Sequence, residues 1–189
     1  RQGDRPGYVF WTSDATQAHA LADPDVASVT RSVFVFRDIP FMLILDKVLK
    51  TNTASQIAAR WFVENSDREG SVDTAGPTFT MNRPNAKFHA VYASNQPFEV
   101  FNDNLPLEES IGVFPYAQVE TSGKTQDALF MMAGSPLAPD AAQPDIKIQQ
   151  AGDTWVVEVT QGSHHLKLQV FDRAEIPEVE IIELWSRSN

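Results

Sequence analysis

The feature of this sequence that most constrains its fold is a succession of short apolar segments, rich in Val, Ile, Phe and Thr and separated by Gly, Pro, Asn and Asp. About a dozen of them follow one another at spacings of roughly 8–12 residues, a pattern typical of β-sandwiches and barrels. The expected strands are residues 8–12, 30–36, 41–48, 56–64, 79–81, 88–93, 98–101, 113–121, 128–133, 145–150, 154–160, 164–172 and 179–185. Helical turns are expected at residues 16–21 and 107–110. The sequence therefore predicts an all-β fold: a sandwich of two antiparallel sheets, similar to a supersandwich.

Two neighbouring segments are expected at the centre of this sandwich. Residues 30–36 and 41–48 are apolar on both faces, as strands covered on both sides are, and residues 37–40 (RDIP) between them predict a tight turn. Residues 56–64 contain Ala and Gln that would suit a helix, but their Trp-Phe-Val run favours a strand. Residues 134–144 hold three of the twelve prolines, so a linker or a long surface loop is expected there.

Composition limits the class of protein. The 189 residues are 42% hydrophobic, which suffices for a core, and one domain over residues 1–189 is expected. The absence of cysteine excludes disulfides, thiolate zinc sites and cysteine nucleophiles. The net charge of −10 disfavours binding to nucleic acid. No apolar run approaches the ~20 residues of a membrane-spanning helix.

The four histidines give weak signals for a site. His164 and His165 are neighbours on an expected strand, so their side chains point to opposite faces and cannot bind one metal together. His89 is expected on a sheet surface or lining a groove. His19 lies in a polar segment near three aspartates, which could orient its imidazole.

The carboxylates show no spacing typical of a catalytic pair. Asp46 follows an apolar strand, where a charge is costly unless it is paired, and Arg31 or Lys47 is the expected partner. Residues 102–104 (NDN) and 108–109 (EE) could offer oxygen ligands to calcium. They lack the alternating ligands and the turn glycine of a calcium loop, which favours a solvated loop.

Among the tryptophans, Trp61 beside Arg60 is the best candidate for stacking against a sugar, whereas Trp155 and Trp185 are expected in the core. The sequence contains no phosphate-binding glycine loop, nucleophile elbow or HExxH zinc motif. The residues by themselves therefore predict a β-sandwich without a self-contained active site, and they indicate no cofactor and no metal.

Three stretches of the chain carry a resemblance to a known family. They are residues 29–48, 56–64 and 113–136, within a region from about residue 20 to residue 136. In the first, Arg31 opens an apolar strand, a turn follows, and a second strand ends in Asp46-Lys47-Val48. This pattern resembles the β-sandwich domain of the heparinase II/III-like polysaccharide lyases.

The resemblance implies a helical toroid that precedes the sandwich, and an activity on uronate-containing polysaccharides such as glycosaminoglycans or alginate. The reaction implied is β-elimination: a base removes the C5 proton, an acid assists departure of the C4 oxygen, and an arginine or polar group neutralises the carboxylate. In the family a Tyr/His pair usually serves as the base and the acid. The family further implies an acidic polysaccharide as partner and a periplasmic or secreted bacterial location.

The chain departs from the family in two places. No His-x-Asp motif precedes Tyr8, and residues 58–61 (AARW) stand where family members often have histidine. The catalytic residues are therefore expected outside this chain, and His19, Arg60 and Trp61 are the candidates for lining the substrate cleft.

The chain begins with RQGD, without methionine or a signal peptide, so we expect it to be the C-terminal part of a longer lyase. The alternative is a non-catalytic carbohydrate-binding or structural module.

Overall fold

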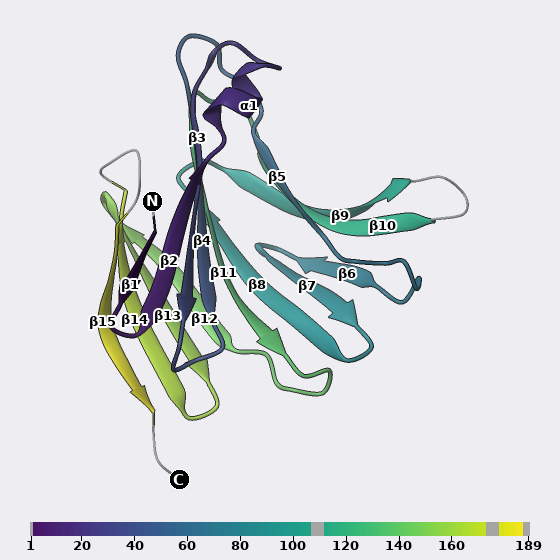
Figure 1. The fold of residues 1–189 in the computed structure, drawn as a ribbon, viewed down its shortest axis with the longest axis vertical. Coiled ribbons are helices and arrows are strands. Elements are labelled where there is room, and N and C mark those ends of the chain that lie inside the picture. The colour runs from purple at the N-terminus through teal and green to yellow at the C-terminus, as the bar shows by residue number, and fades with distance from the viewer. Residues whose placement is uncertain (1, 107–111, 173–177, 187–189) are drawn as a thin grey trace.

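The computed structural model describes residues 2–106, 112–172 and 178–186, and most of them lie in β-strands (Figure 1). The strands are β1 (Gln2–Arg5), β2 (Tyr8–Asp14), β3 (Val26–Phe36), β4 (Met42–Lys50), β5 (Ala58–Phe62), β6 (Ser71–Ala75), β7 (Thr78–Arg83), β8 (Ala86–Ser94), β9 (Phe98–Pro106), β10 (Val113–Thr121), β11 (Asp127–Leu137), β12 (Asp145–Ala151), β13 (Thr154–Gln161), β14 (His164–Phe171) and β15 (Glu178–Ser186). A five-residue helix, α1 (Thr16–Ala20), connects β2 to β3. The expected all-β fold with little helix is confirmed.

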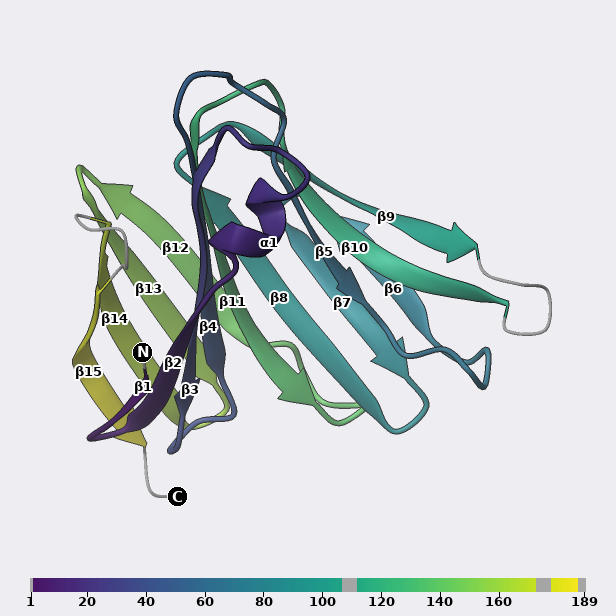
Figure 2. The same ribbon diagram turned by 45° about the horizontal axis from the view of Figure 1, so that its top comes forward.

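Within the described ranges these strands form three antiparallel sheets. The largest has eight strands in the order β1-β2-β3-β4-β11-β8-β7-β6, and the others are β5-β10-β9 and β12-β13-β14-β15. The eight-stranded sheet is the central layer: the four-stranded sheet packs on one of its faces and the three-stranded sheet on the other (Figures 1 and 2). The predicted sandwich is confirmed, and the third sheet is an addition to the two expected.

Alternating side chains of β3, β4 and β11 supply two separate cores. The first core, against the four-stranded sheet, contains Phe34, Phe36, Ile39, Phe41, Leu43, Leu45, Leu129, Met131, Ala133, Trp155, Val157, Val159, Leu166, Leu168 and Val170. The second core, against the three-stranded sheet, contains Val33, Ile44, Ile57, Val63, Val72, Phe79, Ala90, Tyr92, Ala117, Val119, Ala128, Phe130 and Met132. Neighbouring residues of one strand, such as Leu43 and Ile44, therefore face different sheets. This explains why β3 and β4 are apolar on both sides.

The expected loop at residues 134–144 is shorter than predicted. Residues 134–137 continue β11 and pair with β8, so the irregular segment starts at Ala138. Strands β1 and β6 were not predicted, because both are short edge strands whose side chains are mostly polar. The expected helical turn at residues 107–110 lies outside the described residues.

Trp185 was expected in the core, and this prediction is wrong: 42% of its surface is exposed. The cause is a β-bulge between β14 and β15, where Lys167 opposes Glu183 but Leu168 opposes Ile181. The extra residue shifts the inward and outward alternation of β15 by one position. Leu184 packs against the first core after the bulge, and Trp185 points outward.

Candidate functional site

Two pockets open at opposite ends of the space between the eight-stranded and three-stranded sheets. One lies where β5 begins, beside α1, and has a volume of about 560 Å³. The other lies beyond the end of β5, beside β6 and the β9–β10 pair, and has a volume of about 680 Å³. We call them the α1 pocket and the Arg68 pocket.

The α1 pocket combines an apolar wall with two ion pairs. The wall includes Val29, Val48 and Ile57. The ammonium group of Lys50, whose side chain is 3% exposed, donates hydrogen bonds to Asp23 Oδ2 at 2.6 Å and to Ser55 Oγ. Because this charge is buried with its partners in place, it anchors the segment before β5 to the end of β4.

The second ion pair of the α1 pocket joins β3 to β4 through a fork of two hydrogen bonds. Arg31 Nε donates to Asp46 Oδ1 at 2.6 Å, and Arg31 Nη2 donates to Asp46 Oδ2 at 2.8 Å. Asp46 was predicted to have a basic partner, and the structure confirms Arg31 in that role. The hydrogen bonds to Asp46 are the main cause that raises the pKa of Arg31.

Aromatic side chains surround this ion pair. The Arg31 guanidinium lies 4.3 Å from the centre of the Trp61 ring, a cation–π geometry. Burial, and secondarily the Asp46 carboxylate, raises the pKa of Tyr92 well above its ordinary value. The phenol of Tyr92 is therefore kept in its protonated form by its buried surroundings.

The three candidates for lining a cleft do not share one site. His19 lies on α1 and lines the α1 pocket. Trp61 points from β5 toward the second core, where it packs against Arg31. Arg60, its neighbour on β5, is exposed on the opposite face of the three-stranded sheet, 5.2 Å from the centre of the Tyr116 ring. His19 and Trp61 thus lie on the inner side of β5, and Arg60 on the outer side.

The remaining histidines lie apart from both pockets. His89 is 7% exposed, its Nδ1 is 3.0 Å from Thr80 Oγ1, and burial lowers its pKa. His165 stacks on Trp185 with the ring centres 5.0 Å apart. Among the described residues, no three His, Asp or Glu side chains gather in a group that could hold a metal ion. Nor does that part of the chain contain a helix long and apolar enough to cross a membrane.

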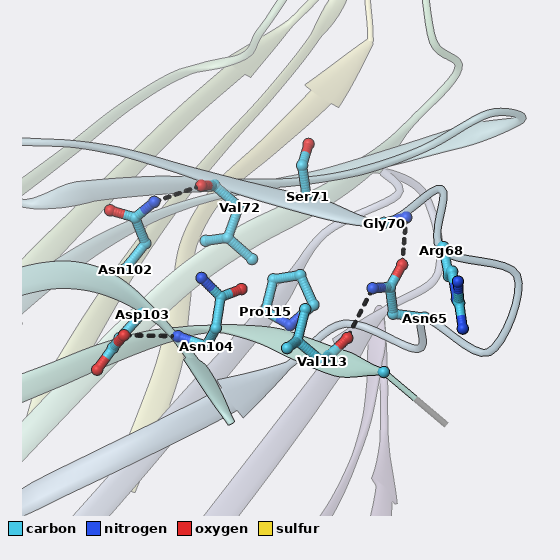
Figure 3. Close-up of a pocket in the computed structure, with 11 residues that line it drawn as sticks. Asn65, Arg68, Gly70, Ser71, Val72, Asn102, Asp103, Asn104, Val113 and Pro115 are labelled. Atoms are coloured by element: carbon cyan, nitrogen blue, oxygen red, sulfur yellow. Dashed lines mark hydrogen bonds between the residues drawn. The ribbon is translucent and has the colours of Figure 1, made fainter. Parts of the chain in front are cut away.

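The Arg68 pocket was not anticipated, because three segments distant in the sequence build it: the loop after β5, the end of β9 and the start of β10 (Figure 3). Asn65 connects two of them. Its Oδ1 accepts a hydrogen bond from the Gly70 N–H at 2.6 Å, and its Nδ2 donates to the Val113 carbonyl at 2.8 Å. Asn102 joins β9 to β6 in the same way, through the Val72 carbonyl at 2.8 Å.

Residues 102–104, considered as a solvated loop, lie instead within β9. Their possible companions at residues 108–109 lie outside the described residues. The Asp103 carboxylate accepts hydrogen bonds from the backbone N–H of Asn104 at 2.7 Å and from the Tyr116 hydroxyl at 3.2 Å. Burial and this contact with Asp103 raise the pKa of Tyr116, which therefore remains a donor at neutral pH. Asp103 thus has a structural role between β9 and β10.

Comparison with known proteins finds similarity in three-dimensional structure alone. No protein-family profile matches the sequence, and no curated protein matches it. Solved structures match the fold, including those of a heparan sulfate lyase and of heparinase III. A heparan sulfate lyase HepC mutant from Pedobacter heparinus has 12% sequence identity and a TM-score of 0.61 over 96% of this chain. A heparinase III gene product has 10% identity and a TM-score of 0.62 over 90% of the chain, and a heparinase III has 12% and 0.63 over 89%.

The chain spans about a quarter of each of these structures, 26–27% of their length. The fold of this chain is therefore that of one portion of heparinase III-type lyases. Identities of 10–12% carry no residue's role from those proteins to this one.

Proposed function

We propose that this chain is the C-terminal β-sandwich portion of a polysaccharide lyase that cleaves a uronate-containing polysaccharide by β-elimination. In this proposal the sandwich supports the substrate cleft and does not catalyse alone. The single observation that carries the proposal is the match of 96% of this chain to 27% of a heparan sulfate lyase. A helical toroid domain would supply the remainder of the enzyme, and the enzyme would act in the periplasm or outside a bacterial cell.

The chemistry of the α1 pocket agrees with a role of the sandwich in binding substrate and not in catalysis. β-Elimination requires a base for the C5 proton and a group that neutralises the uronate carboxylate. Arg31 is already neutralised by Asp46, and the Tyr92 phenol beside this ion pair is buried outside the pocket lining. The described groups of this pocket therefore bind and position, and His19 at its wall offers an imidazole to a substrate bound against this face.

The experiment is a lyase assay on the longer polypeptide that contains this chain, with heparan sulfate, hyaluronan and alginate as substrates. The ultraviolet absorbance of the unsaturated uronate reports the product. Product from at least one substrate, and none from the 189-residue chain alone, is the expected result. No product from any of the three contradicts the proposal and favours the alternative, a non-catalytic carbohydrate-binding or structural module.

Substitutions then separate cleft lining from catalysis. His19→Ala is expected to raise KM about 3- to 10-fold with little change in kcat, as removal of a binding contact does. Trp61 packs against Arg31 in the second core, so Trp61→Ala is expected to lower stability as well. Arg60→Ala tests the outer face of β5 in the same assay, and Arg37→Ala, at the distant β3–β4 turn, is the matched control. A loss of kcat of about 100-fold or more in His19→Ala would contradict the supporting role and make His19 a catalytic residue.

A further inference from the structure

We infer that the Arg68 pocket binds a sugar that carries a single carboxylate, with Arg68 as the carboxylate-binding residue. Arg68 has a φ of +65°, and no other non-glycine residue in the described ranges has a positive φ. This region of φ is costly for a long side chain, and glycine or asparagine would occupy it at less cost. Residues held in such conformations are concentrated at binding and catalytic sites, so the conformation of Arg68 indicates a functional site.

The loop that carries Arg68 is held by contacts of its other residues. The backbone N–H of Arg68 donates to the Asn65 carbonyl at 2.9 Å, which closes a turn. A Cβ atom at Gly70 would lie 2.9 Å from the Glu64 carbonyl oxygen, so this close approach requires glycine. Asp67 is occupied by Arg83, with Arg83 Nη1 donating to Asp67 Oδ1 at 2.6 Å. None of these contacts uses the Arg68 side chain, so the loop does not need an arginine at this position.

The Arg68 guanidinium is exposed at the edge of the pocket (Figure 3). Its Nε lies 3.6 Å from the position that a Cβ of Gly112 would occupy, so the side chain reaches the segment that begins β10. No hydrogen bond or ion pair joins the guanidinium to another residue of the described ranges, although Asp67 and Glu69 are its neighbours in sequence. An exposed guanidinium with no partner among the described residues is suited to a two-point hydrogen bond with a carboxylate.

The rest of the pocket indicates a sugar. The Asn104 side chain points between Val72 and Pro115, and its amide makes no hydrogen bond with a described residue (Figure 3). An amide donates to and accepts from hydroxyl groups, while the apolar surface of Val72, Val113 and Pro115 can contact the apolar face of a sugar ring. The pocket volume of about 680 Å³ lies in the range of small-ligand sites.

The charges of the lining limit the ligand to one anionic group near Arg68. Asp103 also lines the pocket, and a second anion placed toward it would be repelled. A heavily sulfated sugar is therefore disfavoured relative to an unsulfated one with a single carboxylate. The choice of a uronate among carboxylated sugars rests on the proposed function, whereas the location and charge of the site rest on the pocket alone.

The test measures binding, so it is independent of any lyase activity. An unsulfated glucuronate-containing tetrasaccharide is titrated into the 189-residue chain by calorimetry, alongside a neutral tetrasaccharide of glucose and a fully sulfated heparin tetrasaccharide. We expect the glucuronate probe to bind at least about 10-fold more tightly than either of the others, as a charged hydrogen-bonded pair implies.

Arg68→Gly is the decisive variant, because glycine accepts the observed φ without strain. We expect binding of the glucuronate probe to weaken about 10-fold or more while the thermal midpoint stays equal or rises. Arg68→Lys, which keeps the charge without the planar fork, is expected to bind at an intermediate level. Arg37→Ala removes an exposed arginine far from the pocket and is expected to bind as the unaltered chain does.

Several outcomes overturn the inference. Equal binding of the glucose and glucuronate probes would show that no carboxylate is recognised, and tighter binding of the heparin probe would contradict the single-anion limit. A lowered thermal midpoint in Arg68→Gly would show that the arginine stabilises the loop. Absence of binding to all three probes would contradict the inference that the Arg68 pocket is a binding site. The lyase assay on the longer polypeptide would still test the proposed function.

Discussion

The two faces of the central sheet differ in how closely they are covered. On the first-core side the inward side chains of β13 and β14, such as Val157 and Leu168, are wholly inaccessible to solvent, and the Lys47–Asp172 ion pair there is almost fully buried. The space facing the three-stranded sheet also holds the Arg31–Asp46 pair and the buried Asn65, and both large pockets open at its ends. The difference indicates that the four-stranded sheet stabilises the fold and that the three-stranded sheet shapes its binding surfaces.

The size of the covering sheets explains this difference. The four-stranded sheet presents two pairs in continuous register, β12–β13 and β13–β14, and a bulged pair, β14–β15, whose alternating apolar residues cover one side of the central sheet closely. The three-stranded sheet includes β5, which has five residues, and it leaves the space at either end of that strand to loops. Those loops carry part of the polar lining, such as Ser55 in the α1 pocket and Asn65 and Arg68 in the Arg68 pocket.

The largest expected effect comes from breaking the first core. Leu168→Ala removes a wholly buried side chain from β14 and should lower the free energy of unfolding by about 3 kcal/mol, through lost burial and a residual cavity. Urea denaturation measures this change. Ile182→Ala, on the same sheet at a 45% exposed position, is the control and should cost less than about 1 kcal/mol. Equal losses in the two variants would show that the four-stranded sheet is not the stabilising layer.

A smaller loss of stability is expected from the Arg31–Asp46 ion pair, which faces the three-stranded sheet. Asp46→Asn leaves the Arg31 guanidinium without its charged partner and should cost about 1–2 kcal/mol, less than for a fully buried pair because Arg31 is partly exposed. The same denaturation experiment measures it. Asp4→Asn, which breaks the exposed pair with Arg37, should have little effect. A loss larger than that of Leu168→Ala would reverse the ranking of the two cores.

A pH effect is expected at His89, on the part of the central sheet beyond the four-stranded sheet. Burial lowers the pKa of His89 below its ordinary value of 6.5. The unfolded chain therefore takes up a proton before the folded chain does, so the stability contributed by neutral His89 is lost as pH falls below about 6.5. His89→Gln should make the urea midpoint less dependent on pH between 7 and 5. An unchanged pH dependence would contradict a buried neutral imidazole.

The smallest effect on stability is expected at Lys50. Lys50→Met replaces a buried ammonium with an apolar side chain of similar length and leaves the Asp23 carboxylate, which is 45% exposed, in contact with water. The urea midpoint should stay nearly unchanged. The hydrogen bond from Lys50 is the main cause that lowers the pKa of Asp23, so that pKa should rise toward its ordinary value in the variant, as carboxyl NMR titration measures. A marked fall of the midpoint would indicate that the α1 pocket stabilises the fold.

Much of the fold could be predicted from local pattern. The alternation of residues 154–160 and 164–170 predicted β13 and β14 to within about one residue, because a half-buried strand repeats with period two. The pairing of Asp46 with Arg31 could be predicted because a charge in an apolar strand needs a partner. The strand alternation is a local signal, and the pairing of Asp46 follows from the cost of burying an unpaired charge.

The rest depends on contacts between segments far apart in the chain. The pairing of β5 with β10, which creates the third sheet, leaves no trace in the pattern of β5 itself. The bulge that turns Trp185 outward is a single extra residue in an otherwise regular strand. The Arg68 pocket combines three segments and a backbone conformation that the residue type disfavours, so no sequence rule finds it.

The position of β11 has a consequence for how the chain folds. This strand pairs with β4 on one side and with β8 on the other, so it joins the two halves of the central sheet. Until β11 docks, β4 and β8 are two open, apolar edges, which are the kind of surface that associates with other chains. Closure then requires contacts of large sequence separation, for which folding is slow. Synthesis that stalls before residue 127 would therefore yield an aggregation-prone fragment, and docking of β11 is the step at which the central sheet becomes a single cooperative unit.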